Sequence, residues 1–160
     1  MRKNGFTVIE MIVYMALLSV FIAVLSNIFT SSIDVQLDTE ATSSVIHDGR
    51  FLLTRLSYDI RRAQSIMIPT NIGDTTTSLQ LSIDSDTYTY NLTNGNLELT
   101  NASGTDRLNS IGTTVSNLTF QRIGNTNGKN TIRYGFTITS QTETAGGSEV
   151  RNFQTTVGVR

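Results

Sequence analysis

The chain has 160 residues, with 12 lysines and arginines, 13 aspartates and glutamates, one histidine and no cysteine. This length suits one domain, or one domain with an appendage. The formal net charge of −1 argues against a nucleic-acid partner, because nucleic-acid binders usually carry a basic excess. The lack of cysteine excludes disulfide frameworks, thiol nucleophiles and cysteine-based zinc sites. The charges are segregated, since none falls between Met11 and Ile33.

The N-terminal segment has the composition of a membrane-spanning helix. Arg2 and Lys3 precede an apolar stretch that runs from Phe6 to Phe29 and is interrupted by one charge, at Glu10. About 20 apolar residues in a helix span the hydrocarbon core of a bilayer. Cations on the N-terminal flank and acidic residues beyond the far end predict an N-terminus in the cytoplasm and an exported C-terminal side.

Three interpretations of this segment compete. It is an ordinary signal anchor, a secretory signal cleaved near Ser26, or a signal that is processed at its cytoplasmic end. The first two leave Glu10 unexplained, although a carboxylate in a membrane helix costs roughly 2.5–3.5 kcal/mol on insertion scales and is a functional residue by default. Such a carboxylate requires a cationic partner, and none follows it within two helical turns.

The residues Gly5-Phe6-Thr7-Val8-Ile9-Glu10, behind a short basic leader, resemble the processing site of type IV prepilins and pseudopilins. The resemblance implies that a prepilin peptidase cuts between Gly5 and Phe6 and then methylates Phe6. It also makes Glu10 the fifth residue of the processed chain, where the family keeps a glutamate that acts in assembly. A glycine before the cut has no side chain to obstruct the protease cleft.

The helical pattern continues beyond the apolar segment. Between residues 34 and 67 there is no proline, and apolar residues recur at helical spacing. They are Leu37, Ala41, Val45, Leu52, Leu56, Ile60, Ala63 and Met67, with Phe51 and Leu53 widening the face. We expect one helix from Phe6 to about Ile66, roughly 90 Å long and ended by Pro69. Gly49 costs this helix about 1 kcal/mol relative to alanine. Its position marks a bend in the helix or a close contact with a sheet, or the helix simply tolerates a glycine there.

The end of this helix adds a second resemblance. Asp59 is spaced for ion pairs with Arg55 and Arg62, each worth a few tenths of a kcal/mol. The run from Asp48 to Ala63 looks like the helix end of J-type minor pseudopilins of type II secretion and of W-type minor pilins. Asn27 stands where many major pilins have a helix-bending proline, which also favours a minor subunit.

After residue 69 the apolar residues alternate with polar ones, as in half-buried strands. We predict strands around residues 79–83, 88–92, 97–99, 115–123, 132–138 and 153–159. Asn94-Gly95 predicts a tight hairpin and Asp84-Ser85-Asp86 predicts a turn. Residues 124–130 and 142–148 predict loops. The fold class is therefore α+β, a long helix packed on one face of a meandering antiparallel sheet of about six strands.

No catalytic site is evident. His47 is the single histidine, on the polar side of the helix, whereas a zinc site needs three or four ligands. Asp84 and Asp86 are calcium candidates, because some pseudopilin heads bind calcium, although a hairpin turn explains these residues equally well. We expect no enzymatic activity and no cofactor.

Three segments are predicted: a leader over 1–5, a transmembrane and filament-core helix over 6–30, and a globular head over 31–160. The predicted function is that of a minor pilin or pseudopilin near the tip of a type II secretion pseudopilus or type IV pilus, in the bacterial inner membrane before assembly. Its partners are prepilin peptidase, other major and minor pilins or pseudopilins, the inner-membrane assembly platform and membrane lipid. The alternative is a membrane-anchored extracytoplasmic binding module that does not polymerise.

Overall fold

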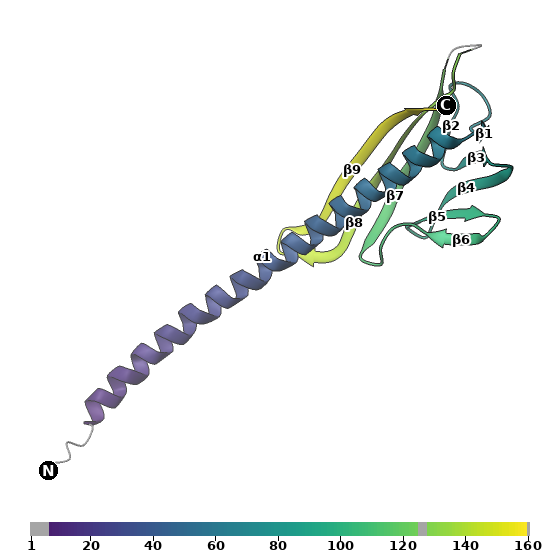
Figure 1. Cartoon of the computed structure of the whole chain (residues 1–160). Helices are drawn as coiled ribbons and strands as arrows, with labels where there is room; N and C mark the ends of the chain where they lie inside the picture. Colours follow the sequence, from purple (N-terminus) through teal and green to yellow (C-terminus); the bar gives the residue numbers. More distant parts are fainter. Residues whose placement is uncertain (1–6, 125–127, 160) are drawn as a thin grey trace. The chain divides into compact units, whose positions relative to one another are not determined.

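The computed structural model of the chain describes residues 7–124 and 128–159. Helix α1 (Val8–Arg62) is followed, in this described part, by nine strands (Figure 1). The chain divides into two compact units, residues 1–37 and 38–160. The boundary predicted near residue 30 stays a prediction.

The strands form two antiparallel sheets within the second unit. Their bounds are β1 (Ser65–Ile68), β2 (Thr75–Thr76), β3 (Leu79–Ile83), β4 (Asp86–Thr93), β5 (Asn96–Asn101), β6 (Gly104–Arg107), β7 (Thr113–Ile123), β8 (Thr131–Thr144) and β9 (Gly147–Gly158). The first sheet has the order β1-β3-β4-β5-β6 and the second has the order β2-β7-β8-β9. The predicted α+β class is confirmed, but two sheets replace the single meander, because β2 and the strands after β6 pair in a second sheet.

The helix ends earlier than the sequence predicts. It stops at Arg62, and β1 occupies residues that were expected to form its last turn. The Gln64 N–H donates to the carbonyl of Ser82 at 2.8 Å, and β1 then pairs with β3. Pairing with a neighbouring strand thus overrides a helical spacing that extends to Met67, whose side chain is exposed.

The predicted apolar stripe packs against both sheets. Among the residues buried on α1 are Ala41, Val45, Leu52, Leu56 and Ile60, all members of that stripe. Except for Ala41, they join one core with strand residues such as Leu81 of β3 and Phe120 of β7. The prediction that Phe51 widens this face is wrong, because its side chain is 46% exposed. Phe51 lies about 100° around the helix from Leu52, outside the stripe.

A bulge in β7 explains an irregular spacing in the sequence. Val115 and Leu118 are both buried although they are three residues apart. The register with β8 shifts between Ser116 and Thr119, and Asn117 adopts a positive φ of 50°. One extra residue in a strand reverses the alternation of its two faces, so both apolar side chains face the core.

The turns are partly as predicted. Asn94 and Gly95, with φ of 50° and 79°, form the tight turn between β4 and β5. The predicted loop over 142–148 is wrong, because β8 continues to Thr144 and β9 begins at Gly147. These ends pair with each other and leave a short turn between them. Of the predicted loop over 124–130, residues 125–127 lie outside the described residues.

Gly49 marks a close contact between α1 and β9, one of the three alternatives that its position allows. A Cβ at this position would lie 2.1 Å from Cζ of Phe153. Non-bonded carbon atoms do not approach so closely, so the ring of Phe153 occupies the space that a side chain would need.

We therefore expect Gly49→Ala to destabilise the fold by about 1–3 kcal/mol, the usual cost of overpacking. Alanine is the better helix former by about 1 kcal/mol, so a helix without this contact would be stabilised instead. Urea unfolding of the full chain in detergent measures the difference. Gly112→Ala is the matched control, because nothing lies within 4 Å of a Cβ there. A gain in stability for Gly49→Ala would contradict the steric explanation.

Candidate functional site

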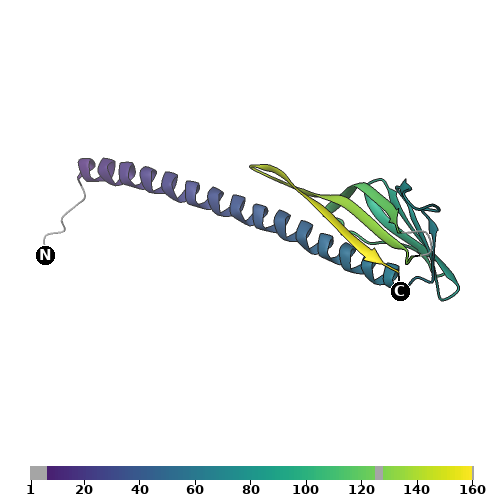
Figure 2. The same cartoon turned by 90° about the horizontal axis from the view of Figure 1, so that it is seen from above.

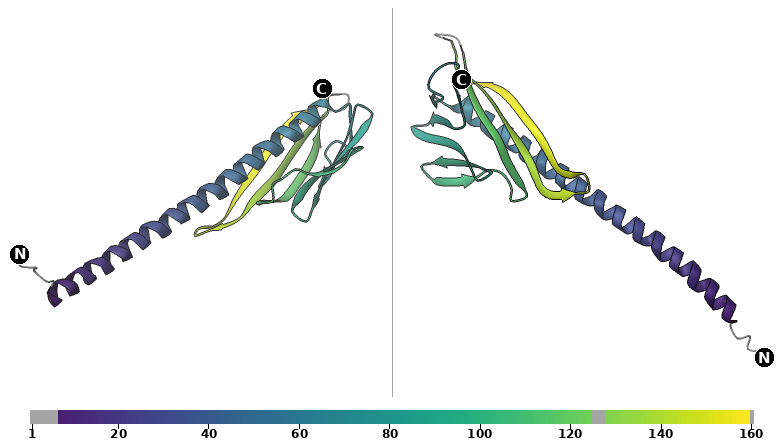
Figure 3. Two further views of the ribbon diagram at one scale, coloured as in Figure 1. Left: turned by 60° about the horizontal axis from the view of Figure 1, so that its bottom comes forward. Right: turned by 180° about the vertical axis from the view of Figure 1, so that it is seen from behind.

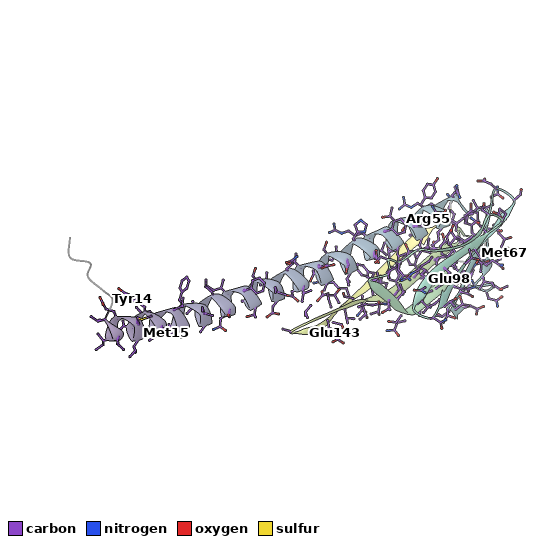
Figure 4. The ribbon with its side chains drawn as sticks, turned by 90° about the horizontal axis from the view of Figure 1, so that it is seen from below. Tyr14, Met15, Arg55, Met67, Glu98 and Glu143 are labelled. Carbon is purple, nitrogen blue, oxygen red and sulfur yellow. The ribbon has the colours of Figure 1, made fainter. Side chains whose placement is uncertain are left out.

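The described residues of the first unit form an apolar helical segment with no burial of its side chains. Every residue from Thr7 to Gln36 is exposed, including Phe21 and Phe29. Figure 4 shows Met15 and its neighbours standing out from the helix. In the described part of the chain, α1 is the one helix that is long and apolar enough to cross a membrane. Apolar surfaces of this extent are rare on soluble monomers, so the segment suits lipid or an apolar protein environment.

Thr7 and Glu10 form reciprocal hydrogen bonds across the first turn of this helix. The backbone N–H and the hydroxyl of Thr7 both donate to Oε2 of Glu10 at 2.9 Å. The N–H of Glu10 donates in return to Oγ1 of Thr7 at 3.3 Å. This reciprocal arrangement is a capping box, which satisfies backbone donors that a helix start leaves without partners. This partner of Glu10 was not predicted from the sequence, although Thr-x-x-Glu before an apolar run is the signature of a capping box.

The C-terminal end of α1 holds a buried ionic cluster. Asp59 is fully buried and lies 2.9 Å from Nε of Arg55 and 3.5 Å from Arg62. Tyr90 of β4 donates its hydroxyl proton to Oδ2 of Asp59 at 2.5 Å. Burial, and then the bond to Asp59, raise the pKa of the Tyr90 phenol. The predicted ion pairs therefore exist, and they also tie the helix to the first sheet.

A second buried carboxylate ties the middle of α1 to the connection between β6 and β7. Oδ2 of Asp48 accepts hydrogen bonds from the N–H and hydroxyl of Ser110 at 2.9 and 2.7 Å, and from the Thr113 hydroxyl at 2.5 Å. Asp48 and Asp59 both fall on the buried stripe of the helix. That placement was the available sequence signal, because a carboxylate on an apolar stripe must find partners.

The remaining candidate residues, His47, Asp84 and Asp86, do not come together as metal ligands in the described part of the chain. The His47 side chain is 85% exposed, as predicted, and lies 4.0 Å from Asp48. Asp84 lies in the turn between β3 and β4, whereas Asp86 accepts from the backbone N–H groups of Thr87 and Ala102. Over residues 7–124 and 128–159, no three histidine, aspartate or glutamate side chains form a metal site. Calcium at Asp84 and Asp86 stays a hypothesis.

The predicted cleavage site lies outside the described residues, since these begin at Thr7. Glu10 is thus the one member of the predicted trio Gly5, Phe6 and Glu10 that the structure places. Residues 1–26, which contain all three, match the family described as the prokaryotic N-terminal methylation motif. No curated protein and no solved structure matches the chain.

The motif is the class III signal of type IV prepilins and pseudopilins, the family that the first ten residues resemble. Together with the exposed apolar start of α1, the motif fits a membrane-anchored α+β protein that carries a processing and methylation signal. Within this class, the motif supports a type IV pilin- or pseudopilin-like protein. Such a motif implies processing by a prepilin peptidase and assembly with other pilins.

Proposed function

We propose that the chain is a structural minor pilin or pseudopilin that is cut between Gly5 and Phe6 and methylated at Phe6. The methylation motif over residues 1–26 carries this proposal. The processed helix stays in the bacterial inner membrane, with its N-terminus in the cytoplasm and the head outside. It leaves lipid only for an equally apolar place, the core of a helical filament, which grows by heterologous contacts that do not close. The proposed role is structural, without catalysis.

The proposed position is at or near the tip, where a J- or W-type subunit primes assembly of a type II secretion pseudopilus or a type IV pilus. The run from Asp48 to Ala63 supports this subtype by its resemblance. The helix is continuous through Asn27, which fits the lack of a bending proline. The proposed partners are sibling pilins or pseudopilins, prepilin peptidase, the inner-membrane assembly platform and membrane lipid.

Processing is tested by Gly5→Val, which places a branched side chain next to the bond that is cut. We expect the unsubstituted protein from its native host to have lost residues 1–5 and gained a methyl group on Phe6. Intact-mass measurement tests this. Gly5→Val should accumulate as an uncut, membrane-anchored precursor. Asn4→Val places the same branched side chain one residue earlier and should still be cut. An intact Met1 in the parent, or a cut after Ser26, would remove the pilin assignment.

Polymerisation separates this proposal from an anchored binding module. Sheared filaments, or a detergent-extracted priming complex, should contain the processed chain at a small fraction of the major subunit. A processed chain that never crosslinks to a sibling subunit would favour the binding module instead.

A further inference from the structure

Strand β9 is a long and unprotected edge. It lies last in the order β2-β7-β8-β9 and forms the outer border of that sheet (Figure 3). Its register with β8 is unbroken from Gly158 to Val150. Natural edge strands are usually guarded by charges, proline, bulges or short length. Residues 152–158 have neither charge nor proline, and the ion pair between Glu149 and Arg151 lies before them.

The free backbone groups of this edge can be assigned. The N–H of Val159 donates to the carbonyl of Asn130 at 2.9 Å, and these two residues continue the β8–β9 register. Since hydrogen-bonded and non-hydrogen-bonded pairs alternate in an antiparallel ladder, the odd-numbered residues of β9 bond to β8. The N–H and C=O groups of Asn152, Gln154, Thr156 and Gly158 therefore point away from β8, and all four residues are exposed.

A groove follows the C-terminal part of this edge, between β9 and α1. It consists of two hollows of about 920 and about 380 Å³ that share Tyr58 and Arg61 as lining residues. Residues 155–158 line its other side, and Figure 2 shows the end of β9 beside the end of α1. Arg61 is exposed, and among the described residues no carboxylate pairs with it.

We propose that this edge binds an extended segment of another protein, which adds to the sheet as a strand beside β9 and places an acidic side chain on Arg61. A row of free N–H and C=O groups selects an extended chain, because a helix has no backbone groups to offer it. The unpaired guanidinium at the groove selects a carboxylate in that segment. The proposal goes beyond the pilin assignment, which concerns the N-terminal helix.

The test uses the detergent-solubilised full chain and a phage-displayed library of random dodecapeptides. We expect enriched peptides that alternate β-branched residues with others and contain an aspartate or glutamate. Thr156→Pro removes an outward N–H and crowds an added strand, yet proline is tolerated at that side of an edge. It should weaken binding of an enriched peptide about tenfold or more, whereas Thr156→Ala, which keeps the N–H, should stay within about twofold.

Arg61→Glu provides a second variant that does not touch the sheet. It should weaken the same peptide about fivefold, and a peptide with lysine in place of the acidic residue should recover that loss. If Thr156→Pro fails to fold, the loss of binding in Arg61→Glu and its recovery by the lysine peptide test the proposal instead. A library without binders, or a binder that neither Thr156→Pro nor Arg61→Glu weakens, would overturn the proposal. Dimerisation of the parent that Thr156→Pro abolishes would overturn it too, because the occupant would then be a second copy.

Discussion

Above about pH 10 the protein should lose more than about 1 kcal/mol of stability for each further pH unit, because two tyrosines are buried in their neutral form. Tyr90 is bonded to Asp59, and Tyr134 donates to the carbonyl of Leu53 at 2.8 Å. Burial raises the pKa of both phenols. The unfolded chain ionises its tyrosines near pH 10 while the folded chain keeps their protons, so rising pH favours unfolding. Below that pH both states are protonated, and these groups contribute no pH dependence.

Urea unfolding in detergent between about pH 8 and about pH 11 measures this slope. Tyr90→Phe should lower the slope by about 1.4 kcal/mol per pH unit, the full contribution of a phenol that stays protonated in the folded chain. Tyr134→Phe should lower the slope too, by no more than this amount. Tyr58→Phe, on a ring that is 56% exposed, is the matched control and should leave the slope unchanged. Tyr90→Phe should also cost about 1–3 kcal/mol at neutral pH, because Asp59 loses a donor. Equal slopes in all four proteins would contradict this explanation.

The features that the sequence predicts well are those that local chemistry decides. Asn94-Gly95 makes a tight turn because both residues tolerate a positive φ. The alternation in residues 79–83 requires only that one face of a strand is buried, and β3 has that burial pattern. The capping box of Thr7 and Glu10 was not predicted, although its signature is also local and contained in four residues.

The features that the sequence does not predict depend on distant partners. Residues 65–68 continue the helical spacing, and they form a strand because β3 offers them a partner. The division into two sheets depends on where the chain turns after β6, which no local pattern specifies. A glycine inside a helix, such as Gly49, indicates that another element can approach closely there. The sequence does not identify Phe153 as the residue that fills this space.

Glu10→Gln should leave insertion and cleavage normal and should impair incorporation of the chain into its filament or priming complex. This change separates the observed capping role of Glu10 from its proposed role in assembly. Glutamine also fits the third position of a capping box, so the start of α1 is kept. The charge is lost, and with it the proposed pairing of the carboxylate with the α-ammonium that cleavage would create at Phe6, on its own or a neighbouring chain. Breaking a buried ion pair costs about 3–5 kcal/mol, so incorporation should fall more than about 100-fold. Crosslinking to sibling subunits measures incorporation, with cleavage followed in the same sample.

Thr7→Val is the matched control, because it removes the capping hydroxyl at nearly constant size and leaves the carboxylate charged. The lost cap costs about 1 kcal/mol at the helix start, and the valine chain should still be incorporated close to the parent level. The pairing explanation requires this order, with Glu10→Gln defective and Thr7→Val nearly normal. The reverse order would make Glu10 a helix cap. Full crosslinking, together with full secretion or piliation by Glu10→Gln, would remove the charge of Glu10 from the assembly mechanism. In that case the capping box of Thr7 and Glu10 alone would account for a carboxylate at the start of a membrane helix, since its oxygen accepts two hydrogen bonds there.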